Sequence, residues 1–141
     1  MWNHKSGRVL LTYTSFLFGL TSLKAMALQH WMAPTFLVQM ALSLVHHGKW
    51  HDTYFGKDFI KWTDKGLAKY ITLRSAYEAY YYKLTPGMKV YWLCFVWVVY
   101  IHCIGRYNRP NHNRASLWHS TLHITSNLGC LSMLYAIKNE L

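Results

Sequence analysis

Histidine is the residue whose number and spacing stand out in this chain. The 141 residues include nine histidines, and two pairs lie four positions apart: His47 with His51, and His119 with His123. On a helix this spacing puts both rings on one face, where they can ligate the same metal ion. With nine histidines, about half of one such pair arises by chance, so a single pair is more often structural than ligating.

The wider arrangement of polar residues indicates a hydrolytic metal centre. Ser43 precedes His47 by one helical turn, Asp64 opens the next expected helix, and His119 and His123 lie near the start of the last. Three neutral imidazoles and a water make a tetrahedral zinc site with an open position. Water on zinc ionises near neutral pH and can attack an ester or amide carbonyl. Asp64 or Ser43 could hydrogen-bond that water or orient a ligand.

The elements that must position these residues are five apolar runs. Hydrophobic residues make up 52% of the chain and charged residues only 14%, against about 25% charged in ordinary soluble domains. We therefore expect an all-α polytopic membrane bundle that forms a single domain over residues 1–141. The expected helices cover residues 9–28, 32–47, 65–82, 88–105 and 115–137. The helix over 65–82 carries charges and could instead lie on the surface or line a polar interior.

The distribution of charge favours a membrane over nucleic acid as the partner. Fifteen Lys and Arg residues stand against five acids, but the basic residues lie between the apolar runs and do not form one dense stripe. If all five helices span, nine cations share the side of the N-terminus and four lie opposite. The positive-inside rule then puts the N-terminus in the cytoplasm. The C-terminal tail 138–141, Lys-Asn-Glu-Leu, is similar to the endoplasmic-reticulum retention tetrapeptide.

The order of the polar residues resembles a known family. Ser43-x-x-x-His47, then Asp64 seventeen residues later, then His119-x-x-x-His123 is similar to the progestin and adipoQ receptor/hemolysin III family. That family belongs to a superfamily of membrane hydrolases that includes the alkaline ceramidases. The resemblance implies zinc held by His47, His119 and His123, with Ser43 and Asp64 near the bound water. It also implies a cytoplasmic N-terminus.

Two short segments carry the resemblance further. The stretch Thr63–Ala68 is similar to the segment that opens the family's third helix, and Trp118–His123 resembles its last-helix histidine motif. The family has seven spans, and this chain has room for five, so a shortened version of that fold is expected. Because two is an even number, the loss of two spans leaves each motif on the same side of the membrane as in the family. Asp58, eleven residues after His47, is an alternative that fits the ceramidase-type spacing better.

Three functions are compatible with these features. The first is a zinc-dependent integral membrane hydrolase that acts on a lipid amide or ester. The second is a non-catalytic small subunit of a larger membrane complex, or of a homo-oligomer. The third is a haem-b carrier that uses His46 or His47 with His119 or His123. In the hydrolase interpretation, His46 is structural or interfacial because it points away from His47 on a helix.

Overall fold

The chain folds into a bundle of α-helices. The computed structural model describes residues 4–48, 56–107 and 112–141, and no strand occurs within these ranges. An all-α fold was expected and is confirmed. Six helical segments make up the described part: α1 His4–Ser15, α2 Leu17–Ala27, α3 Met32–His47, α4 Lys57–Tyr80, α5 Pro86–Tyr107 and α6 His112–Asn139.

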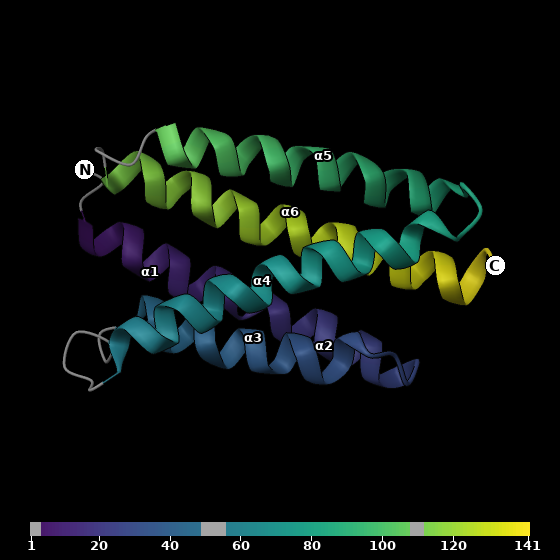
Figure 1. The fold of residues 1–141 in the computed structure, drawn as a ribbon, viewed down its shortest axis with the longest axis horizontal. Helices are drawn as coiled ribbons and strands as arrows, with labels where there is room; N and C mark the ends of the chain where they lie inside the picture. Colours follow the sequence, from purple (N-terminus) through teal and green to yellow (C-terminus); the bar gives the residue numbers. More distant parts are fainter. Residues whose placement is uncertain (1–3, 49–55, 108–111) are drawn as a thin grey trace.

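Successive rods of the bundle run in opposite directions. The α1–α2 pair forms one rod, and α3, α4, α5 and α6 form the others (Figure 1). The start of α1, the end of α3 and the start of α6 therefore lie at one end of the bundle, which we call the histidine end, and the C-terminus lies at the other. The main packing contacts join α5 to α6, α2 to α3, α1 to α6 and α3 to α4, whereas α4 touches α5 and α6 only lightly.

A local break at Phe16 separates α1 from α2. The hydroxyls of Thr14 and Ser15 both donate to the carbonyl of Leu11, at 3.2 and 2.7 Å. Such side-chain bonds compete with the backbone ladder and bend helices. At the break, the Phe16 and Gly19 amides donate to carbonyls three residues earlier, which is the tighter 3₁₀ pattern. The break leaves Thr14 and Ser15 buried between α3 and α6.

The interior combines an apolar core with buried serines, and further large apolar side chains face outward. The core includes Phe18, Phe36, Met32, Met133 and Leu134. Five serines are almost completely buried: Ser15, Ser22, Ser43, Ser75 and Ser120. Large apolar residues are exposed at helical spacing along the first rod, at Val9, Tyr13, Phe16, Leu20 and Leu23, and along α5, at Leu93, Val96, Trp97 and Tyr100. Exposed apolar stripes of this kind mark a surface that contacts a membrane or another protein.

Two helices in the described part are long and apolar enough to cross a membrane. They are Arg8–Ala27, which joins α1 and α2, and Pro86–Tyr107, which is α5. Close packing of α5 on α6 depends on Gly129, because a Cβ added there would lie 2.8 Å from the Cβ of Cys94. Small residues at helix contacts are typical of membrane bundles, where they let the backbones approach closely.

A partly buried carboxylate at the far end ties α4 to the turn between α2 and α3. Glu78 accepts hydrogen bonds from His30 Nε2 at 2.8 Å, from Trp31 Nε1, and from Tyr82 Oη at 2.7 Å. The Arg74 guanidinium lies 5.5 Å from the centre of the Trp31 ring. These contacts explain how a charged helix packs in an otherwise apolar bundle.

The expected bounds of the third helix were wrong at its start. Helix α4 begins at Lys57, eight positions before the expected start at 65. Gly56, the residue before the helix, is in the left-handed region at φ 92°, and Asp58 in the first turn offsets the positive end of the helix dipole. Asp64 therefore lies two turns inside the helix and faces the interior.

Candidate metal centre

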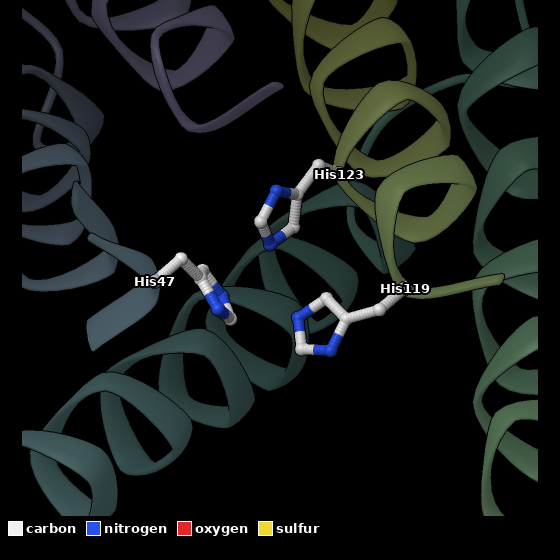
Figure 2. A group of neighbouring side chains, drawn as sticks. All are labelled: His47, His119 and His123. Atoms are coloured by element: carbon white, nitrogen blue, oxygen red, sulfur yellow. The ribbon is translucent and has the colours of Figure 1, made fainter. Parts of the chain in front are cut away.

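Three histidine rings converge at the histidine end of the bundle. His47 is the last residue of α3, and His119 and His123 lie one turn apart near the start of α6. Their ring centroids are 4.8–5.6 Å apart, and one nitrogen of each lies within 4.8 Å of the others. Figure 2 shows the rings turned toward a common space between the two helices. This group, which we call the three-histidine group, could hold a metal ion.

Thr14 orients the ring of His123. The Thr14 hydroxyl oxygen lies 3.2 Å from the Leu11 carbonyl oxygen and 3.0 Å from His123 Nδ1. In the tautomer with the ring proton on Nδ1, His123 donates to Thr14 and keeps its Nε2 lone pair for a metal, the usual arrangement of a ligating histidine. Asn127, one turn further along α6, donates to the His123 carbonyl at 2.8 Å and accepts from Thr21 at 2.6 Å.

Ser43 is fully buried one turn before His47 and is bonded to Ser15. The two hydroxyl oxygens lie 2.9 Å apart. Because Ser15 donates its hydrogen to the Leu11 carbonyl, Ser43 is the donor in this pair. The lone pairs of Ser43 remain as its hydrogen-bonding capacity, so it can accept a hydrogen bond but has no hydrogen left to give.

Asp64 belongs to a second group of ligand atoms beside the first. One atom each of His46, His47 and Asp64 lies within 4.8 Å of the others. The Asp64 carboxylate accepts a hydrogen bond from Gln39 Nε2 at 2.6 Å, and its other oxygen lies 3.8 Å from His46 Nδ1. Asp64 is only 5% exposed, so its carboxyl group lies inside the protein. We call this set the His46–Asp64 group.

The structure brings together the three histidines expected to ligate metal. Asp64 adjoins them through His47, whereas Asp58 is exposed in the first turn of α4 and lies outside both groups. His51, the expected partner of His47 in an i,i+4 pair, lies outside the described residues. His46 was expected to be structural, yet its ring centroid is 4.5 Å from that of His47.

Sequence reasoning missed Thr14, Ser15 and Gln39. Gln39 could have been found, because it lies four positions before Ser43 and eight before His47, on the same helix face. Thr14 and Ser15 lie with Leu11 and Phe18 on the buried helical stripe of the first rod, a spacing that is visible in the sequence.

Comparison of the chain with protein-family models, with curated proteins and with solved structures finds no match. Function is therefore inferred from the residues of the site and their geometry.

Proposed function

We propose that this protein is an integral membrane hydrolase that holds zinc in the three-histidine group and cleaves a lipid amide or ester. The observation that carries the proposal is the convergence of His47, His119 and His123, from helices far apart in sequence, at one end of the bundle. Clusters of three imidazoles suit zinc, and an open fourth position is typical of catalytic zinc sites. The resemblance to the progestin and adipoQ receptor/hemolysin III family points the same way.

The distribution of side chains supports insertion in a membrane. Large apolar residues face outward on several helices, and two helices are long and apolar enough to span. The histidine end carries the described cations Arg8, Lys61, Lys65, Arg106 and Arg114. By the positive-inside rule this end faces the cytoplasm. The C-terminal tail then lies outside or in a lumen, where a retention signal of the endoplasmic reticulum would act.

Each residue of the site has a part in the proposed hydrolysis. When bound, zinc would supply a water that ionises near neutral pH and would polarise the substrate carbonyl. His47, His119 and His123 would hold it, and Thr14 would keep His123 in the ligating tautomer. Ser43 would accept a hydrogen bond from the attacking water. As the water oxygen bonds to the carbonyl carbon and the C–N or C–O bond breaks, Asp64 would take up the proton of the water and return it to the leaving group.

The first test is the metal content of detergent-purified protein. We expect zinc in the wild type and loss of the zinc of the three-histidine group in His119→Ala. His102→Ala, which changes an exposed histidine of α5, should retain it. Hydrolysis is then assayed on vesicles that carry fatty-acyl amides or esters. Wild-type protein without zinc would refute the proposal. A Soret band would then favour a haem-b carrier, and stable co-purifying partners would favour a subunit of a larger membrane complex.

A further inference from the structure

The His46–Asp64 group has the composition of a cation site of its own. We propose that His46 and Asp64 hold a second divalent cation next to the three-histidine group, so that the protein has a two-metal centre. This inference rests on the proposed function, because it assigns His47 to the first ion. Each of the two groups brings its ligand atoms within 4.8 Å of one another, and His47 is the residue they share.

The separation of His46 and Asp64 fits two ligands of one ion. His46 Nδ1 lies 3.8 Å from an oxygen of Asp64, whereas an N–H···O hydrogen bond measures about 2.7–3.2 Å. Two ligands on one tetrahedral ion, each bonded at about 2.0–2.1 Å, lie roughly 3.3–3.4 Å apart. A small rotation of either side chain would therefore place both on a common cation.

Gln39 supplies an independent indication of a ligand. Its amide nitrogen donates to one oxygen of Asp64 at 2.6 Å, which holds the carboxylate with its other oxygen toward His46. Gln39 is only 2% exposed, and its carbonyl oxygen has no hydrogen-bond partner among the described residues. A buried acceptor without a partner is costly, and amide carbonyls are common ligands of divalent cations.

Charge also favours a cation at this position. Asp64 is a buried carboxylate whose hydrogen-bond donor, Gln39, is neutral. Lys65, the next residue of α4, interacts electrostatically with both Asp64 and His119. Its ammonium lies 5.4 Å from the centre of the exposed Trp62 ring, which places it toward the outside. If no second ion binds, Lys65 is the counter-charge of Asp64.

A second cation would divide the work of hydrolysis. If the second ion binds, Asp64 acts as its ligand, and the task of orienting and deprotonating the attacking water passes from Asp64 to that ion, while the first ion stabilises the developing charge on oxygen. The mixed nitrogen and oxygen ligands of the His46–Asp64 group suit zinc or manganese. This site offers fewer histidines than the three-histidine group, so we expect it to fill second and to bind more weakly.

The test is a metal titration of the full-length protein in detergent. Protein stripped with a chelator is titrated with Co²⁺, whose visible absorption reports coordination, and Zn²⁺ stoichiometry is measured by mass spectrometry. The wild type should bind two equivalents in two phases. His46→Ala and Asp64→Asn should lose the weaker phase and keep the tighter one, while His119→Ala loses the tighter phase. Asp58→Asn, which changes an exposed acid of the same helix, should keep both.

The outcomes separate this inference from the proposed function. A single equivalent in the wild type, kept in Asp64→Asn and lost in His119→Ala, would overturn the second site and leave the zinc hydrolase intact. No bound metal at all would overturn both. Far-ultraviolet circular dichroism on each variant identifies any loss of binding that comes from unfolding. If a histidine-to-alanine variant is unfolded, the asparagine or glutamine replacement at the same position is titrated instead. If Asp64→Asn is unfolded, Asp64→Ser is titrated instead.

Discussion

Replacement of Thr14 by valine tests the metal centre through a residue that cannot itself ligate. Valine has nearly the shape of threonine but lacks the hydroxyl that accepts from His123 Nδ1 at 3.0 Å. Thr14 is 6% exposed, so water does not readily replace the lost acceptor. We expect Thr14→Val to weaken the tight zinc site.

The magnitude follows from what the hydroxyl does before and after zinc binds. In Thr14→Val, both the zinc-free and the zinc-bound protein lose a buried hydrogen bond and leave a ring N–H without its acceptor, which costs about 1–3 kcal/mol of folding stability. Zinc affinity changes only by the difference between the losses in the zinc-free and the zinc-bound protein. The ring N–H becomes a stronger donor when Nε2 is ligated, and loss of such partners typically weakens metal binding about 10- to 100-fold.

The assay is competition for zinc with a chromophoric chelator in detergent. Thr14→Ser keeps the hydroxyl and should bind zinc nearly as tightly as the wild type. Thr12→Val removes a hydroxyl from the same helix that donates only to the Arg8 carbonyl, and it should leave the affinity unchanged. Equal zinc affinity of Thr14→Val and Thr12→Val would refute the assigned role of Thr14 and the tautomer inferred for His123.

Two further predictions concern the stability of the bundle, measured by unfolding in detergent. Gly129→Leu should destabilise the protein by about 1–3 kcal/mol, because the new side chain overlaps Cys94 on α5. The Cβ added by Gly66→Ala in α4 has no neighbour within 4 Å, so this variant should be neutral or stabilising by up to about 1 kcal/mol. Equal changes in stability for Gly129→Leu and Gly66→Ala would contradict the close-packing argument. Glu78→Gln should lower the stability by about 1–3 kcal/mol, since it weakens hydrogen bonds to a charged acceptor that three side chains share. The Glu140 carboxylate accepts only from the Gly87 amide among the described residues, so Glu140→Gln should lower the stability less than Glu78→Gln does. A larger loss of stability in Glu140→Gln than in Glu78→Gln would contradict the role given to Glu78.

The helices and the proximity of the three histidines could be predicted from the sequence for a simple physical reason. Apolar runs of this length form helices, and short connections make successive helices antiparallel, so the end of α3 and the start of α6 must share one end of the bundle. The alternating direction of successive helices therefore predicts that His47 and His119 lie at the same end of the bundle, without any knowledge of packing. The same reasoning places α3 at Met32–His47 almost directly from the apolar run.

The rest depended on packing that no local pattern encodes. The segment before Asp64 is polar and aromatic, so it was assigned to a connection, yet residues 57–63 form the first turns of α4 with most of their described side chains exposed. Thr14 and Ser15 lie on the buried stripe of the first rod, and the packing of that rod against α3 and α6 brings them to the site. His46 was set aside by its position on an ideal helix, whereas its ring turns toward Asp64 at the end of α3.

The three-histidine group has a consequence for how the protein is made. His47 belongs to α3, and its partners lie on α6, with α4 and α5 in between. During synthesis this group is therefore complete only after the last helix has been made. A metal ion bound there would join the first half of the chain to the last, and a chain truncated before α6 would contain only one of the three histidines.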